Sequence, residues 1–141
     1  DGCHLPIEIL QMVYRLKGVE KTALTCDSMR CAGQDVKESI LGSLENGQRV
    51  IIEDDVAKMP DRTAFAGSVA TADRLVRNML NMAEVPLIDV ITMACRTPAK
   101  IMGFTDRGEL KPGLRADVIL FDEDIHVSHV IVGGRTIYTE E

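Results

Sequence analysis

The sequence predicts an α/β fold followed by a smaller region of β strands. Residues 1–26 read as loop, helix and strand, because apolar residues recur at helical spacing after Pro6 and Thr22–Cys26 form a short apolar run. A helix followed by a strand buried on both faces is one step of a parallel α/β architecture. From Gly108 onward, short β-rich runs alternate with Gly and Pro. We therefore expect an α/β part over residues 1–104 and β strands over residues 105–141.

The first helix should cover residues 7–17, with Pro6 in its first turn and Gly18 ending it. An excursion containing a β-hairpin is expected at about residues 33–60, with Asn46-Gly47 as the hairpin turn. The acidic run at 53–55 is interpreted as a solvated turn.

Helical spacing returns at Ser68, which is placed to cap a helix whose apolar face carries Ala72, Leu75, Val76, Met79 and Met82. A second helix is expected over residues 86–94, and a separate short one that begins with Thr97 as cap and Pro98 in its first turn. The last forty residues predict strands at 108–110, 117–121, 127–132 and 135–138, with turns at Pro112-Gly113 and Gly133-Gly134.

Composition limits the possible functions. The chain has 141 residues, 45% of them hydrophobic, which is enough for one domain with a core. A net charge of -6 argues against a nucleic-acid surface. No apolar run approaches the roughly 18–20 residues of a membrane span, and no signal-peptide pattern opens the chain. The four cysteines lack CxxC spacing, so free thiols in a reducing cytoplasm are expected for Cys3, Cys26, Cys31 and Cys95.

Candidate functional residues are few, and spacing alone leaves their roles open. Asp27 ends the predicted strand and could cap the next turn, by accepting the backbone N–H of Met29 or Arg30, or take part in chemistry. His4 follows Asp-Gly in a loop and by itself indicates little. His126 and His129 are three apart in a predicted strand, so their side chains point to opposite faces and joint metal binding is not expected.

Four motifs carry a resemblance to a known family. They are DGCH at 1–4, LTCDSMRCAG at 24–33, FAGSVATADRLVRNM at 65–79 and TPAKIMGFTDRGELKPGLRADVILFD at 97–122. In this order they resemble the carboxy-terminal part of the N-acetylglucosamine-6-phosphate deacetylases of the amidohydrolase superfamily. The last motif is shared by many amidohydrolases, whereas DG-x-H followed by T-x-D and AGS is more specific to the deacetylases.

The resemblance implies a (β/α)8 barrel with a small β-sandwich domain, whose active site lies at the carboxyl ends of the barrel strands. His4 would follow the seventh strand and Asp27 would end the eighth. Residues 68–83 would form the last barrel helix, and the terminal strands would belong to the sandwich. By this resemblance the chain is expected to be the carboxy-terminal portion of a longer enzyme, beginning partway through the fold.

The resemblance also implies roles for the loop residues. Asp27 would be the general base and acid that moves a proton from a metal-bound water to the leaving amine. His4 would hydrogen-bond the amino sugar, and the backbone around it would also contact substrate, through Asp1, Gly2 and Cys3. A second substrate-contacting stretch would comprise Phe65, Ala66 and Gly67, with the alternative of an ordinary loop-to-helix junction.

A divalent metal, zinc or similar, is implied as cofactor, but the family's glutamate and two histidine ligands have no counterparts in this sequence. We therefore expect the isolated chain to bind no metal tightly and to lack activity. The expected partners are an amino-sugar phosphate and a second copy of the protein, with no nucleic acid and no membrane. The alternatives are a deacetylase of N-acetylgalactosamine 6-phosphate, another amidohydrolase, or a non-catalytic α/β module that binds sugar or a partner chain.

Overall fold

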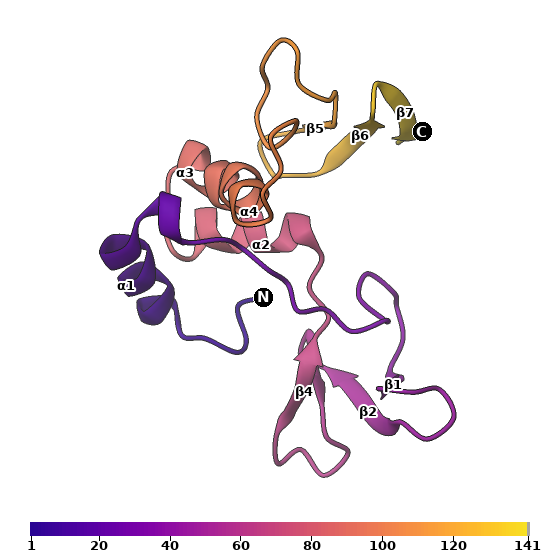
Figure 1. Cartoon of the computed structure of the whole chain (residues 1–141). Coiled ribbons are helices and arrows are strands. Elements are labelled where there is room, and N and C mark those ends of the chain that lie inside the picture. Colours follow the sequence, from indigo (N-terminus) through magenta and orange to yellow (C-terminus); the bar gives the residue numbers. More distant parts are fainter. Residues whose placement is uncertain (141) are drawn as a thin grey trace.

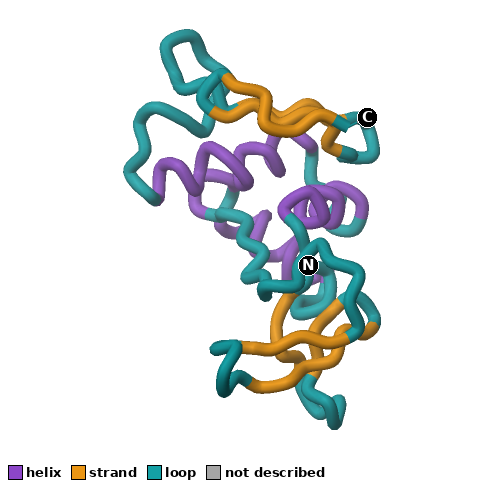
Figure 2. Tube along the Cα trace, turned by 90° about the vertical axis from the view of Figure 1, so that its right-hand side faces the viewer, coloured by secondary structure: helices purple, strands orange, loops and turns teal. Residues whose placement is uncertain are grey.

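A group of helices lies between two antiparallel sheets in the computed structural model, which describes residues 1–140 (Figure 1). The helical part comprises α1 (Ile7–Lys17), the 3-10 turn η1 (Val19–Lys21), α2 (Ala72–Asn81), α3 (Leu87–Ile91), the π-helical turn η2 (Thr92–Arg96) and α4 (Thr97–Ile101). One sheet has the order β1-β2-β3-β4 and consists of Glu38–Leu41, Gln48–Glu53, Val56–Lys58 and Phe65–Ser68. The other has the order β5-β6-β7 and consists of Val118–Phe121, Val127–Val132 and Arg135–Thr139. Figure 2 shows the two sheets at opposite ends of the molecule, with the helices between them.

Helix α1 matches its prediction closely. Gly18 ends it with a φ of +68°, and its N–H donates to the Tyr14 carbonyl at 2.9 Å. Pro6 lies at the N-cap position instead of in the first turn. The Tyr14 hydroxyl donates to Asp89 Oδ2 at 2.5 Å, which ties α1 to α3 and raises the pKa of Tyr14 because the bond stabilises the protonated phenol.

The strand predicted at residues 22–26 is wrong as stated. This segment carries no strand assignment, and Thr25 is exposed, so the segment is not buried on both faces. The Leu24 N–H donates to the Met93 carbonyl at 3.0 Å, and the ladder contact that follows the segment is an isolated parallel bridge between Ser28 and Ser68. A strand needs a hydrogen-bonded neighbour along its length. Among residues 1–140, no strand runs beside residues 22–26.

The hairpin predicted in the excursion is confirmed, since β1 and β2 pair antiparallel. Its predicted turn is wrong, because the connection runs over residues 42–47 and Asn46-Gly47 is only its last part. A second hairpin joins β2 to β3 through Asp54 and Asp55, whose φ angles of +52° and +60° fit the two-residue turn that matches strand twist. The acidic run is thus the solvated turn that was expected. Strands β3 and β4 were not predicted.

The cap assigned to Ser68 is wrong. Helix α2 begins at Ala72, and Ser68 lies at the end of β4, where its hydroxyl accepts the Ala70 N–H at 3.0 Å. The hydroxyl therefore stabilises the turn between strand and helix. Three of the five residues predicted for the apolar face of α2 are buried, namely Leu75, Val76 and Met79. Ala72 is exposed, and Met82 lies just past the end of the helix.

The short helix predicted from Thr97, with Pro98 in its first turn, is present as α4, but Thr97 is not its cap and the helix is not separate, because α3, η2 and α4 follow one another without a break over residues 87–101. Thr97 has helical φ and ψ, and its buried hydroxyl donates to the Val19 carbonyl at 2.6 Å. Proline lacks the N–H that an α-helix would bond one turn back. The π turn comes immediately before Pro98, which lets the helix continue despite the missing donor.

In the C-terminal sheet, strands β5 to β7 follow three of the four predicted runs. Gly133 and Gly134 form the β6–β7 turn, with φ of +56° and +79°. The strand predicted at 108–110 is absent. Residues there lie in a loop closed by the Arg115 N–H, which donates to the Asp106 carbonyl at 2.7 Å.

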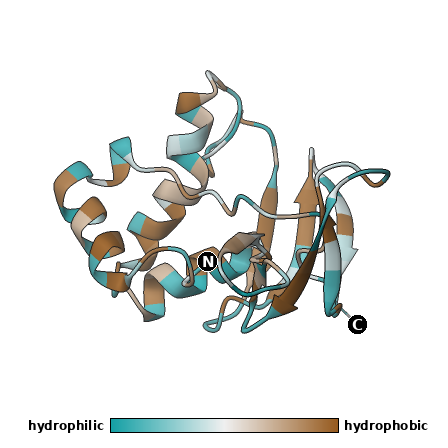
Figure 3. Cartoon of the chain, turned by 90° about the horizontal axis from the view of Figure 1, so that it is seen from below, coloured by the Kyte–Doolittle hydropathy of each residue, from teal (hydrophilic) through white to brown (hydrophobic). Residues whose placement is uncertain are grey.

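The core lies among the helices and includes one loop of the C-terminal sheet. Its buried cluster consists of Val76, Met79, Ala83, Val85, Val90, Met93 and Ile125. Figure 3 shows apolar residues along the helices and strands in bands separated by polar ones. None of the described helices is both long enough and apolar enough to cross a membrane.

Candidate functional site

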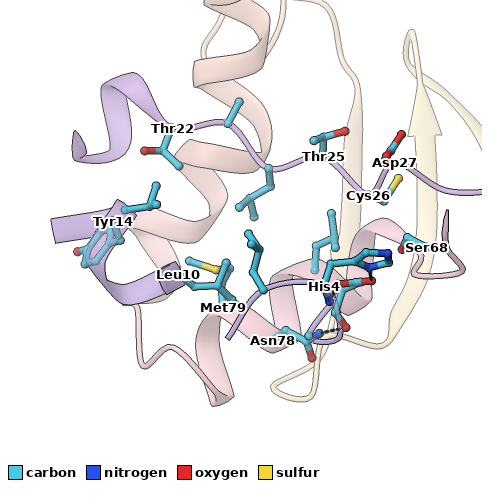
Figure 4. Close-up of a pocket in the computed structure, with 17 residues that line it drawn as sticks. His4, Leu10, Tyr14, Thr22, Thr25, Cys26, Asp27, Ser68, Asn78 and Met79 are labelled. Carbon is cyan, nitrogen blue, oxygen red and sulfur yellow. Dashed lines mark hydrogen bonds and ion pairs between the residues drawn. The ribbon is translucent and has the colours of Figure 1, made fainter. Parts of the chain in front are cut away.

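A cavity of about 390 Å³ lies between the N-terminal loop, α1, the segment 22–27 and α2. This volume falls within the range of small-molecule sites. Figure 4 shows Cys26, Asp27, Ser68 and His4 gathered on one side of the cavity, with Leu10, Tyr14 and Thr22 on the other. The cavity therefore has one side that carries polar and titratable groups and one that is largely apolar.

Asp27 lies at the end of the segment 22–27, where its side chain is exposed and lines the cavity. Its φ is +46°, a left-handed conformation that few non-glycine residues adopt and that Asp tolerates better than most. Within residues 1–140, no hydrogen bond reaches its carboxylate, and the Met29 N–H that it could have capped donates to the Ser68 carbonyl at 2.9 Å instead. The carboxylate is therefore available to a ligand.

The loop after Asp27 is fixed against the end of β4. The Ser28–Ser68 bridge joins the two segments, and the Ser28 hydroxyl donates to the Ala70 carbonyl. Gly67 has a φ of +144°, and a Cβ there would lie 2.8 Å from Met29 Cγ. Glycine is therefore required by both conformation and space at this position. The Met29 side chain is therefore the group that packs against Gly67.

The N-terminal loop is organised by the Asp1 carboxylate, whose side chain is only 8% exposed. Oδ1 accepts the N–H groups of Cys3 at 3.1 Å and His4 at 3.2 Å, and Oδ2 lies 2.5 Å from His4 Nδ1. Asn78 of α2 donates to the Asp1 carbonyl at 2.7 Å. The His4 ring lies 5.0 Å from the Phe65 ring, centroid to centroid, at an interplanar angle of 56°. These contacts bring the first loop and β4 together.

Four of the predicted contact residues do not line the cavity, namely Cys3, Phe65, Ala66 and Gly67. Cys3 points toward the β2–β3 turn, with its sulfur 4.0 Å from the carbonyl oxygens of Asp54 and Asp55 and 3.7 Å from Arg74 Nη2. Ala66 is half-buried in β4 and does not line the cavity.

Sequence reasoning missed three residues here. Asn78 positions the Asp1 backbone, and Ser28 holds the two loops together, as described above. The Cys26 thiol lines the cavity, and its pKa is lowered mainly because Ser28 hydrogen-bonds it and so stabilises the thiolate. No spacing signal marks these residues, since each depends on a contact distant in sequence or on an ordinary small polar side chain.

The residues present do not form a metal site by themselves. Throughout residues 1–140, no three His, Cys, Asp or Glu side chains gather closely enough to hold an ion. Both oxygens of Asp1 already have partners, which leaves Asp27 as the free carboxylate on the cavity. His126 Nδ1 lies 3.2 Å from Asp122 Oδ2, and His129 Nδ1 lies 3.0 Å from Ser128 Oγ.

Comparison with known proteins identifies the family. Residues 1–137 match the Amidohydrolase family. The chain belongs to the amidohydrolase family. The resemblance inferred from the four motifs is therefore confirmed at the family level.

Individual relatives of this amidohydrolase chain are named as deacetylases. It is 32% identical over 135 residues to the N-acetylglucosamine-6-phosphate deacetylase of Lysinibacillus sphaericus, covering 96% of this chain and 34% of that protein. It is 31% identical over 118 residues to a putative N-acetylgalactosamine-6-phosphate deacetylase of Escherichia coli K12, covering 82% of this chain and 67% of that protein. The crystal structure of the Thermotoga maritima N-acetylglucosamine-6-phosphate deacetylase matches with a TM-score of 0.86 at 28% identity, covering 99% of this chain and 37% of that one. The chain thus spans about a third of the length of the Lysinibacillus and Thermotoga relatives.

Proposed function

We propose that this chain carries the proton-transfer aspartate and part of the sugar-binding surface of a deacetylase that hydrolyses the acetamide of N-acetylglucosamine 6-phosphate. The observation that carries the proposal is the Asp27 carboxylate, which is exposed, lacks a protein partner within residues 1–140 and shares a cavity with His4. The deacetylase relatives support the choice of reaction, and the relative from Lysinibacillus supports the choice of sugar.

Hydrolysis of an acetamide needs a proton to move twice. A bond forms between the water oxygen and the acetyl carbon while a proton leaves the water, and the carbon–nitrogen bond then breaks as the nitrogen gains a proton. A single carboxylate can accept the first proton and deliver the second. Asp27 suits this role because no internal hydrogen bond occupies its oxygens. The products are acetate and a free amine.

The sugar would lie against the loops that flank Asp27. His4 offers a ring nitrogen without a protein partner among the described residues, and Phe65 offers a half-exposed aromatic face beside it. Asp1 and Gly2 line the same cavity, and Gly67 packs closely against Met29 in the loop after Asp27. In this proposal Cys3 and Ala66 contribute through their backbone.

The architecture of the related structures supports a finer assignment. Among residues 1–140 the segment 22–27 has no strand beside it. We propose that it becomes the last strand of a (β/α)8 barrel when it pairs with barrel strands from outside this chain, and that α2 belongs to the last barrel helix. Residues 105–141 would then be strands of the small β-sandwich domain, and residues 1–104 part of the barrel with its β1–β4 excursion. Asp27 would lie at the carboxyl end of its strand, where barrel enzymes place catalytic groups.

Deacetylases of this family are generally metal-dependent, and a bound divalent ion supplies an activated water. Because residues 1–140 provide no ligand set, we propose that the ligands come from polypeptide outside this chain. The 141 residues alone should then neither retain zinc nor turn over substrate. A homo-oligomer and a cytoplasmic location remain predictions.

A second candidate substrate is N-acetylgalactosamine 6-phosphate, favoured by the similarity to the Escherichia coli K12 protein. The two sugars differ at one ring hydroxyl, so the relative rates of acetate release from them decide between the two substrates.

The test is acetate release by a chimera that joins the preceding two thirds of the Lysinibacillus deacetylase to this chain. We expect release from N-acetylglucosamine 6-phosphate, with the galactosamine isomer assayed in parallel and the 141-residue chain alone as the inactive control. A folded, metal-loaded chimera that releases no acetate from either sugar would reject the deacetylase and favour a non-catalytic binding module.

A further inference from the structure

The pairing of Asp1 with His4 has a consequence for which nitrogen of the imidazole carries the proton. An ionised carboxylate can only accept hydrogen bonds. Asp1 Oδ2 lies 2.5 Å from His4 Nδ1, so Nδ1 must be the donor. In the neutral ring, Nε2 is then an acceptor without a hydrogen.

The rest of the Asp1 environment keeps the carboxylate in this orientation. Oδ1 accepts two backbone N–H groups, from Cys3 and His4, and the Asp1 carbonyl accepts the Asn78 amide. The carboxylate is nearly buried at 8% exposure, whereas the His4 side chain is 37% exposed. The buried partner is thus fixed, and the exposed ring is the part that a ligand can reach.

The surroundings of the ring indicate what it would accept. His4 lines the cavity. Phe65 is 49% exposed, and its ring centroid lies 5.0 Å from that of His4. A hydrogen-bond acceptor beside an exposed aromatic face suits a ligand with a hydroxyl donor and an apolar face, which is the chemistry of a pyranose ring.

We propose that Asp1 is a positioning residue that holds His4 as the Nδ1–H tautomer, so that Nε2 accepts a hydrogen bond from a hydroxyl of a sugar ring lying against Phe65. The sugar part of this inference rests on the proposed function, whereas the tautomer does not. In this role the Asp1 carboxylate acts through His4, whatever contact the Asp1 backbone makes with the substrate.

The substitution Asp1→Asn tests the tautomer with almost no change in shape. Its amide oxygen can still accept the Cys3 and His4 N–H groups, but its NH₂ group then faces Nδ1 as a donor. Nδ1 must become an acceptor, and the proton moves to Nε2. The matched control is Asp122→Asn, which alters the carboxylate paired with His126 and leaves the His4 pair intact.

The measurement is a long-range ¹H–¹⁵N correlation spectrum of the ¹⁵N-labelled 141-residue chain at alkaline pH, where imidazole rings are neutral. We expect a protonated Nδ1 at His4 in the unchanged chain and in Asp122→Asn, and a protonated Nε2 in Asp1→Asn. A protonated Nε2 at His4 in the unchanged chain would overturn the inference, even if Asp1→Asn failed to fold.

The consequence for the sugar is measured separately in the chimera. Asp1→Asn should raise KM for the amino-sugar phosphate about threefold and leave kcat nearly unchanged, because the sugar hydroxyl must then turn to accept a hydrogen bond from Nε2–H, and this change affects ground and transition states equally. An unchanged KM alongside a switched tautomer would overturn the positioning role. An inactive chimera with the expected tautomers would reject the proposed function and leave the tautomer assignment standing.

Discussion

Two aspartate–histidine pairs in this chain share nearly the same local design and differ in their surroundings. In each, one carboxylate oxygen accepts two backbone N–H groups and the other faces a histidine Nδ1, at 2.5 Å for Asp1–His4 and 3.2 Å for Asp122–His126. The first carboxylate is 8% exposed and its histidine lies beside a cavity and an aromatic ring. The second pair is 58% and 65% exposed on the loop before β6.

The aspartate–histidine pairing by itself stabilises a turn. The burial of the carboxylate and the neighbours of the histidine decide whether the pair can take part in ligand binding. Exposed carboxylate–imidazole pairs contribute little because water competes for both groups. A buried carboxylate beside a ligand-sized cavity fixes the proton position of the ring that faces the ligand. Asp-x-x-His and Asp-x-x-x-His in the sequence do not reveal which of the two situations applies.

Replacement of the two histidines should give the largest contrast between the pairs. In the chimera, His4→Ala should raise KM for N-acetylglucosamine 6-phosphate by about tenfold or more, since it removes both a hydrogen bond and ring contact with the sugar. His126→Ala should leave KM unchanged. Equal effects of the two changes on KM would show that His4 binds the sugar no more than His126 does.

Two glycines allow the same contrast in stability. Gly67→Ala should lower the free energy of unfolding by about 2–3 kcal/mol, because it adds a clash with Met29 to the strain of a positive φ. Gly134→Ala, in the β6–β7 turn with φ of +79° and open space around it, should cost about 1 kcal/mol. Urea unfolding of the three chains measures both values. A cost for Gly67→Ala no greater than that for Gly134→Ala would show that the contact with Met29 is not tight.

The smallest expected effect is a loss of folding stability at acid pH through Asp122. The His126 N–H bonded to Asp122 is the main cause that lowers the pKa of that carboxyl below its ordinary value of 3.8. The folded state therefore gains stability from Asp122 at pH above 3.8 and loses it as the pH falls through the lowered pKa. An NMR titration should show the Asp122 carboxyl and the His126 amide shifting together below pH 3.8. A carboxyl that titrates at or above 3.8 would contradict this.

The parts predictable from sequence are those set by local pattern. Helical spacing and Gly18 defined α1, and Gly133-Gly134 defined the last hairpin, because each depends on neighbouring residues alone. Thr97 was misread because its hydroxyl donates to the Val19 carbonyl, a contact that only the folded chain creates. Ser68 was misread because its hydroxyl accepts the N–H two residues on, in a turn that precedes the helix.

The candidate site was predictable only through motif resemblance. The sequence marked Asp27 and His4 as candidates. It did not predict that Cys3 and Ala66 lie away from the cavity, or that Asn78 binds the Asp1 carbonyl. The His4–Phe65 contact joins residues 61 positions apart, and no local periodicity encodes it. Such contacts arise from the Ser28–Ser68 bridge and the packing of α2, which are tertiary features.

The central claim is that Asp27 transfers the proton in amide hydrolysis, and kcat for acetate release by the chimera tests it most directly. Asp27→Asn should lower kcat about 10³-fold with little change in KM, which is the usual scale of general acid–base catalysis. The matched control is Asp55→Asn, since Asp55 is also exposed and left-handed, with φ of +60°, but lies in the β2–β3 turn away from the cavity. A kcat for Asp27→Asn equal to that of Asp55→Asn would contradict the account.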